Sequence, residues 1–338
     1  MQVNKKLYIV PALLIGLVVL LVIRSEFGSK SISSSIQIQS IQEDGRRFDD
    51  RDREVPAFRV MSDVDTTEID NKIVAYYQDI LEWTPAYYGL TDQEFGERLR
   101  EMCDYYEDIC DKIKLEADFS LKEAYNFTVF TIHIVTSIDN NTVLEWIWSL
   151  RSTLASMRFT KDSVDIVRGK AWHRNVLINT YDMRDVVELL EIITHELGHI
   201  MGLWVIQDDA NPNKNTDYLE FGEPAFGAND WSLKFYSISR ETNEVRRNSS
   251  TNSNMISGYG HTNTYEEFAE FFNAWINHHT PLLELAKTDN SIRKKYFLFR
   301  ELFGKRYLNA DVETYRDLDS STRPYDTTRR HDAAIHVH

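Results

Sequence analysis

The chain has 338 residues, of which 42% are hydrophobic and 12% aromatic, which is enough to build one large domain or two small ones. Its formal net charge is −15, and no patch rich in lysine or arginine interrupts this acidity. The composition therefore excludes a typical nucleic-acid-binding surface, and we expect no nucleic-acid partner. It does not predict an oligomeric state.

The N-terminal segment has the features of a membrane anchor. Residues 7–23 carry no charge, with Lys5 and Lys6 before them and Arg24 after them. This run is just long enough to span a bilayer, and no small-x-small cleavage site follows it closely. We interpret it as a transmembrane signal anchor, with a cleaved signal peptide and secretion as the alternative. The lysines then place residues 1–6 in the cytosol and the rest of the chain outside it.

Three further segments differ in composition. Residues 24–56 are rich in Ser, Gln, Asp and Arg and lack a core-forming period, which is typical of a flexible stalk. We expect the folded domain over 57–315 and a polar tail over 316–338.

Within the domain, apolar residues recur at helical spacing in some segments, and β-branched and aromatic residues cluster in others. Thr91 or Asp92 is a plausible cap for one of the helices. In chain order the patterns predict helices over 66–83 and 92–114, a strand over 127–136, a helix over 143–157, and strands over 163–167 and 175–179.

The two cysteines, Cys103 and Cys110, both fall within the helix predicted over 92–114. On one helix they would lie about 10 Å apart along the axis, too far for a disulfide. We therefore expect two half-buried thiols. A bridge across a broken helix is the alternative if the compartment is oxidising.

The motif HELGH at 195–199 carries the clearest chemical signal. Positions i and i+4 share one face of a helix, so His195 and His199 can bind one metal ion, with Glu196 close enough to reach a water on it. Zinc hydrolases use this arrangement: the metal activates a water, and the glutamate takes its proton. The competing interpretation is an amphipathic helix with two solvated histidines.

We expect the motif helix to run from about Asp182 to near Gly202, with a broad apolar arc buried in the core. The opposite face is expected to be solvent-exposed, as the floor of a cleft. It comprises Arg184, Glu188, Glu191, His195 and His199.

A third zinc ligand must come from another segment, because Val205 occupies the place of the third histidine of the extended motif. The best source is an amphipathic helix whose core stripe begins at Phe268. Glu266 and Glu270 project opposite that stripe. Glu266 is the expected ligand, and Glu270 is expected to accept a hydrogen bond from the remote nitrogen of a ligand histidine.

Other assignments remain open at this point. Glu266 and Glu270 together are equally compatible with a solvated acidic face. His261, Glu267 and Asp230 are competing candidates for the third ligand.

Taken together, HELGH at 195–199 and YGHTNTYEEFAEFF at 259–272 resemble the catalytic domains of anthrax lethal factor and the bacterial Pro-Pro endopeptidases, which are gluzincin-like zincins. They are also similar to a wider set of bacterial zinc-binding metallopeptidases, often lipoproteins or anchored proteins. The resemblance covers about 183–300 and hardly extends before 160. It departs at His261 and Glu267, so it implies no substrate preference.

The resemblance implies an α+β zincin-type domain, mostly helical with a small mixed sheet. It places zinc between His195, His199 and Glu266, and makes Glu196 the general base. Tyr259 takes the place of a tyrosine that hydrogen-bonds the oxyanion, where negative charge develops on the carbonyl oxygen.

The sequence thus predicts a zinc-dependent endopeptidase, anchored in the membrane and facing away from the cytosol, with a peptide or protein substrate. Zincins generally bind substrate as an extra strand along a sheet edge, which 175–179 or 127–136 would supply. One alternative is a zinc-stabilised binding ectodomain without turnover. A zinc amidase acting on a non-protein amide is another.

Overall fold

The computed structural model describes residues 67–303, except 143–147, 166, 182, 184, 207–212, 221, 225 and 251–254. The segments predicted as cytoplasmic N-terminus, membrane anchor, stalk and polar tail lie outside these residues. Within the described part of the chain, no helix combines the length and the apolar character needed to cross a membrane.

The described chain is mostly helical with a small mixed sheet, which confirms the α+β prediction. A π-helical turn, η3 (Met201–Val205), continues α8, and a 3-10 turn, η5 (Tyr259–His261), precedes α10. The helices are α2 (Thr67–Leu81), α3 (Pro85–Tyr88), α4 (Asp92–Tyr105), α5 (Glu107–Cys110), α6 (Leu121–Asn141), α7 (Leu150–Thr153), α8 (Val186–Ile200), α9 (Trp231–Ser239), α10 (Thr264–Asn277), α11 (His279–Thr288) and α12 (Asn290–Phe303).

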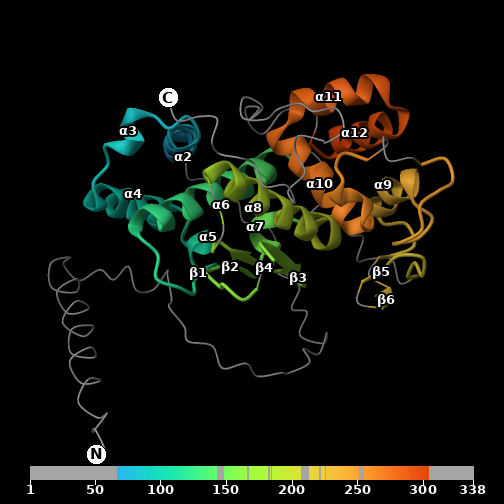
Figure 1. The fold of residues 1–338 in the computed structure, drawn as a ribbon, viewed down its shortest axis with the longest axis horizontal. Coiled ribbons are helices and arrows are strands. Elements are labelled where there is room, and N and C mark those ends of the chain that lie inside the picture. Colours follow the sequence, from blue (N-terminus) through green and yellow to red (C-terminus); the bar gives the residue numbers. More distant parts are fainter. Residues whose placement is uncertain are drawn as a thin grey trace, which may run out of the picture.

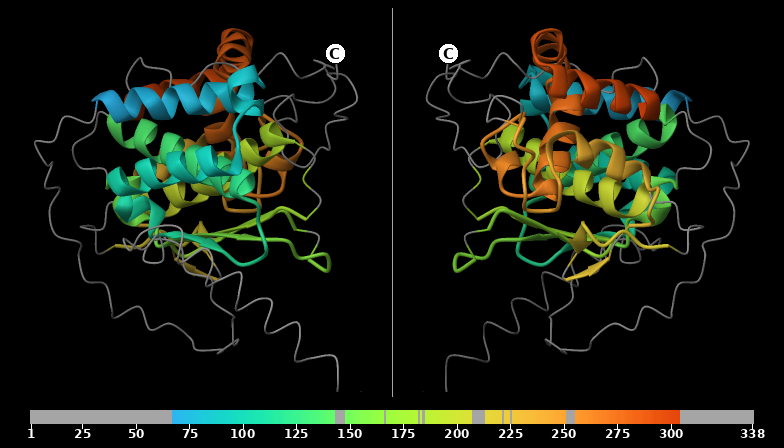
Figure 2. Two further views of the ribbon diagram at one scale, coloured as in Figure 1. Left: turned by 90° about the vertical axis from the view of Figure 1, so that its left-hand side faces the viewer. Right: turned by 90° about the vertical axis from the view of Figure 1, so that its right-hand side faces the viewer.

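The main sheet has the order β1-β2-β4-β3. Strands β1 (Ile113–Leu115), β2 (Ser156–Thr160) and β4 (Asn175–Asn179) are parallel, and β3 (Gly169–Trp172) joins β4 antiparallel. A second, two-stranded sheet pairs β5 (Leu219–Glu220) with β6 (Glu223–Pro224). The helices lie over one face of the main sheet (Figures 1 and 2). That face is buried, since Met157, Phe159, Val176 and Ile178 are all 0% exposed.

The strand predicted over 127–136 is wrong, because these residues form the middle of α6. Ser120 and Glu123 cap the start of this helix reciprocally. α6 is buried on all sides over this stretch, so its sequence shows no helical alternation of apolar and polar residues. The hydroxyl of Thr128 donates to the carbonyl of Ala124 (2.8 Å), which satisfies a polar group inside the core.

The helix predicted over 66–83 is confirmed as α2, whereas the helix over 92–114 is confirmed only in part. It begins at the predicted cap, Thr91, but ends at Tyr105, because Tyr106 leaves the helical conformation (φ −113°, ψ 44°). This break brings the Cα atoms of Cys103 and Cys110 to 5.6 Å, and the two residues form a disulfide. The expectation of free thiols is therefore wrong, since it assumed one continuous helix.

Two further predictions are also wrong. Of the helix predicted over 143–157, residues 143–147 lie outside the described part, α7 is a single turn, and 156–157 belong to β2. Of the strand predicted over 163–167, residues 163–165 and 167 lie in a loop and 166 is outside the described part. The carboxylates of Asp162 and Asp165 accept hydrogen bonds there from backbone amides two residues further on. The strand predicted over 175–179 is confirmed as β4.

Candidate metal centre

The motif helix α8 begins later than predicted. Asp185 is its N-cap and accepts a hydrogen bond from the amide of Glu188 (2.8 Å), while Asp182 lies outside the described residues. The predicted apolar arc is buried. The face predicted to be solvent-exposed is wrong, because Glu188 and Glu191 are buried as well. Glu188 pairs with Arg168, and Glu191 lies 3.1 Å from Nε2 of the buried His278. Partners from other segments thus cover Glu188 and Glu191, while Arg184 lies outside the described residues.

The glycine of the motif allows α8 and α10 to cross closely. A Cβ atom on Gly198 would lie 3.0 Å from Cα of Ala269 and 3.2 Å from Cβ of Phe272. The core stripe of α10 is buried as predicted. At the start of α10, Asn263 accepts hydrogen bonds from the amides of Tyr265 and Glu266 (2.9 and 3.0 Å). This cap fixes Glu266 at the first turn, opposite α8.

At the crossing, three side chains converge. Nε2 of His195 lies 3.0 Å from Oε2 of Glu266 and 3.2 Å from Nε2 of His199. Nε2 of His199 lies 3.3 Å from the same Glu266 oxygen. Among the described residues, this trio forms the group of His, Cys, Asp and Glu side chains close enough together to hold a metal ion. The structure therefore brings together the three predicted ligands.

The remote nitrogen of His195 also meets its predicted partner. Nδ1 of His195 lies 2.7 Å from Oε1 of Glu270, whose side chain is fully buried. A proton on Nδ1 is donated to this carboxylate, which leaves the lone pair of Nε2 directed at the trio.

The trio fits a metal ion in both charge and spacing. Donor atoms that bind a zinc ion at about 2.0–2.1 Å in a tetrahedral site lie about 3.3 Å from one another, close to the 3.0–3.3 Å between the donor atoms of the trio. Three electron-pair donors this close repel each other unless protons or a cation lie between them. Burial lowers the pKa of His195, but Glu266 and Glu270 outweigh burial and raise this pKa well above its usual value. The site thus stabilises positive charge between these groups.

Glu196 lies beside the trio, against the edge strand β3. A Cβ atom on Gly169 of β3 would lie 2.3 Å from Oε1 of Glu196, so only a glycine leaves room for the carboxylate there. Glu196 is 6% exposed, and burial raises its pKa. Its Oε2 has no hydrogen-bond partner within the described part of the chain. Oε2 of Glu196 is therefore an acceptor atom that no described residue occupies by a hydrogen bond.

Tyr259 is the other predicted catalytic residue, and it borders the same site. Its ring centroid lies 5.8 Å from that of His195. Burial first, and then the carboxylates of Glu266, Glu196 and Glu270, raise the pKa of Tyr259 above its usual value. The phenol therefore stays protonated at neutral pH and is a hydrogen-bond donor.

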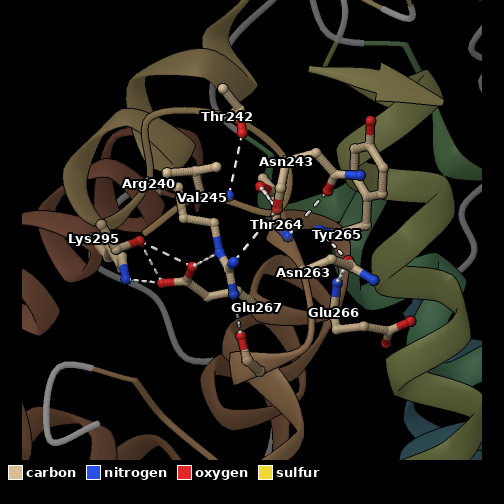
Figure 3. A network of polar contacts seen from close by, with 12 residues as sticks. Arg240, Thr242, Asn243, Val245, Asn263, Thr264, Tyr265, Glu266, Glu267 and Lys295 are labelled. Carbon is tan, nitrogen blue, oxygen red and sulfur yellow. Dashed lines mark hydrogen bonds and ion pairs between the residues drawn. The ribbon is translucent and has the colours of Figure 1, made fainter. Parts of the chain in front are cut away.

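The competing candidates for the third ligand are not in the trio. Glu267 points away from α8, toward Arg240 and Lys295, whereas Glu266 points toward α8 (Figure 3). Asp230 accepts a hydrogen bond from the amide of Gly227 at the start of α9. His261 is half-buried in η5 and does not belong to the convergent group.

Neither of the two segments predicted to form the substrate-binding edge of the sheet lies at an edge. Residues 127–136 are helical, and β4 lies between β2 and β3, so neither is an edge of the sheet. The edge beside Glu196 is β3, which the sequence interpretation missed. β3 is joined to β4 by a two-residue hairpin connection between Trp172 and Asn175, and this short connection was the available indication of a strand before β4.

Comparison of the chain with protein-family models, with curated proteins and with solved structures found no match.

Proposed function

We propose that this protein is a zinc-dependent endopeptidase of the zincin type. The observation that supports the proposal best is the convergence of His195, His199 and Glu266, with Glu196 alongside. Two imidazoles and one carboxylate are a common ligand set for catalytic zinc, which keeps a further position open for water or substrate. A purely structural zinc site usually has four protein ligands and has no need of a free carboxylate beside it.

The site residues divide the chemistry as follows. Bound zinc supplies Lewis acidity toward a water molecule and the substrate carbonyl. Glu196 accepts the proton of the attacking water and later delivers it to the leaving amine. Tyr259 donates a hydrogen bond to the carbonyl oxygen as negative charge develops on it. Glu270 orients His195 through Nδ1.

The edge strand β3 is the proposed platform for the substrate. The amide of Asn179 donates to the carbonyl of Arg168 (2.7 Å), so Arg168 and Asn179 form a hydrogen-bonded pair of the antiparallel ladder between β3 and β4. Because such pairs alternate along the ladder, the backbone groups of Gly169 and Ala171 point away from β4. An extended peptide that pairs with these groups passes directly beside Glu196.

The proposed location is outside the cytosol. The uncharged run over 7–23 supports a membrane anchor, with secretion as the alternative if the run is cleaved. The disulfide between Cys103 and Cys110 is consistent with an oxidising compartment.

The variant Glu196→Gln tests the proposal. It keeps the size of the side chain but removes the proton acceptor, so we expect at least a thousand-fold loss of peptide cleavage, on the order of removing a catalytic base. Bound zinc, measured by elemental analysis, should stay at the wild-type level. Cleavage is read from a diverse peptide library, with and without a chelator.

Two other outcomes would overturn the proposal. A wild-type protein that binds zinc but cleaves no peptide would indicate a zinc-stabilised binding ectodomain. Zinc-dependent hydrolysis confined to non-protein amides would indicate an amidase.

A further inference from the structure

A buried group of charged side chains lies behind the metal centre, on the far side of α10. Glu267 accepts a hydrogen bond from Nε of Arg240 (3.0 Å) and pairs with Lys295, and Ser239 donates to it (2.7 Å). Arg240 is 0% exposed, and Glu267 and Lys295 are each 1% exposed. Figure 3 shows Arg240 and Lys295 approaching Glu267 from separate elements. The proposed reaction uses none of these groups.

Arg240 also reaches the turn that carries Tyr259. Its Nη2 donates to the carbonyl of Gly260 at 2.9 Å, while its Nε remains on Glu267. One guanidinium thus joins η5 to the first turn of α10. Its planar fork makes both contacts at once, which the single ammonium of a lysine cannot reproduce.

The backbone amide of Gly260 is held by a hydrogen bond as well. Its amide donates to Oγ of Ser257 at 3.0 Å, and both Gly260 and Ser257 are buried. A Cβ atom on Gly260 would lie 3.4 Å from Cα of Glu267, so the turn rests directly on α10. Gly260, the residue that follows Tyr259, is therefore held by a hydrogen bond at its amide and by another at its carbonyl.

We propose that Arg240 and Ser257 are positioning residues for Tyr259: by holding Gly260, they set where the phenol lies relative to His195, His199 and Glu266. The inference rests on the proposed function, since it assigns Tyr259 the task of binding the oxyanion. A donor of this kind is effective only if it lies about 2.7–3.1 Å from the oxygen, and a misplacement of about 1 Å is costly. The side-chain hydrogen bonds of Arg240 and Ser257 go to Glu267, Asn243 and Gly260, and not to the three proposed metal ligands.

The test compares Arg240→Lys and Ser257→Ala with the control Lys295→Met in the full-length, zinc-loaded protein. Arg240→Lys keeps a cation beside Glu267 but loses the bond to Gly260, and Ser257→Ala removes the second bond with little change in volume. We expect each to lower kcat about ten-fold, with KM nearly unchanged, as for a displaced transition-state donor. Lys295→Met keeps both bonds to Gly260, so kcat should stay within about two-fold of wild type even if the protein is less stable.

Each variant is then combined with Tyr259→Phe, which lacks the phenol. If Arg240 and Ser257 act through Tyr259, neither substitution lowers kcat further in that background. A loss that adds in full to the effect of Tyr259→Phe, or no loss in either single variant, would overturn the inference.

Amide hydrogen exchange of residues 257–263, followed by mass spectrometry, gives a readout that needs no activity. Arg240→Lys and Ser257→Ala should speed exchange in this segment relative to both wild type and Lys295→Met. Equal exchange in all four proteins counts against the inference. If wild type cleaves no peptide, the proposed function fails, and the exchange experiment still tests how the turn is held.

Discussion

Gly169 shows how one residue of the edge strand determines the position of the proposed general base. Its φ is not positive, so alanine fits its backbone. The Cβ atom of alanine, however, would lie 2.3 Å from Oε1 of Glu196 and 2.8 Å from its Cδ. We expect Gly169→Ala to rotate the carboxylate away from the site and lower kcat about a hundred-fold, since a shift of about 1 Å costs that much. Steady-state kinetics and zinc content measure the effect.

The matched control is Gly96→Ala, the same chemical change on α4. There the new Cβ meets only Cδ1 of Leu121, at an ordinary 3.9 Å. Activity should be unchanged and the free energy of unfolding should rise by about 0.5–1 kcal/mol, as for a glycine replaced within a helix. Equal activity of both variants would show that Glu196 does not need its place beside β3.

At the scale of elements, the disulfide joins α4 to α5 across the break at Tyr106. Its loop is short, with a sequence separation of 7, so the bond stabilises the fold by about 2–3 kcal/mol. We expect the double substitution Cys103→Ser and Cys110→Ser to lower Tm by on the order of 5 °C. Activity at 25 °C should persist, because no proposed site residue lies on α4 or α5. Reductant should lower the Tm of wild type but not that of the double variant, and a shift in both would contradict the assignment.

The crossing of α8 and α10 gives a second prediction at this scale. Gly198→Ala places a Cβ atom 3.0 Å from the backbone of Ala269. Overpacking of about 1–3 kcal/mol exceeds the gain of about 1 kcal/mol in helix propensity. The helices should therefore separate slightly, moving His195 and His199 away from Glu266. We expect weaker zinc binding, measured by competition with a chromogenic chelator, and wild-type affinity would contradict this account.

The same two helices show how far the sequence predicts the site. The spacing within HELGH, and the opposition of Glu266 to the stripe that begins at Phe268, were readable because each is set by local helical geometry. The partners that bury the polar face of α8 could not be predicted in this way. Arg168 and His278 reach Glu188 and Glu191 from distant segments, and no local period encodes such contacts. The sequence thus predicted which groups meet, but not that they are buried.

The fold was less predictable where burial removes the pattern. The middle of α6 is buried on all sides, and its β-branched and aromatic residues are typical of a strand, which explains the wrong prediction. The reciprocal cap between Ser120 and Glu123 was the available signal for a helix start. The position of β3 depends on strand pairing, which a short segment such as Gly169–Trp172 does not specify by itself.

For the whole molecule, zinc should be part of its stability. The proposed ligands come from α8 and α10, so the metal links two helices that are far apart in the sequence. At zinc concentrations of about 100 to 1,000 times Kd, binding adds about 3–4 kcal/mol to the free energy of unfolding. We expect a chelator to lower Tm and added zinc to restore it, as measured by calorimetry.

Two variants make this measurement specific. Glu266→Ala should abolish the shift in Tm, because a ligand is lost. Glu196→Gln should keep the full shift, because the base is not a ligand. A wild-type Tm that is the same with chelator and with zinc would contradict the metal centre.

The order of the site residues along the chain has a consequence for biosynthesis. His195 and His199 are translated well before Tyr259 and Glu266. A nascent chain that has emerged only as far as HELGH has two of the three proposed zinc ligands and lacks Tyr259, the proposed oxyanion donor. Such a chain lacks the complete site that peptide hydrolysis requires. The proposed site is completed only when α10 docks on α8, so the chain must be made at least to Asn277, the end of α10, before the proposed reaction can take place.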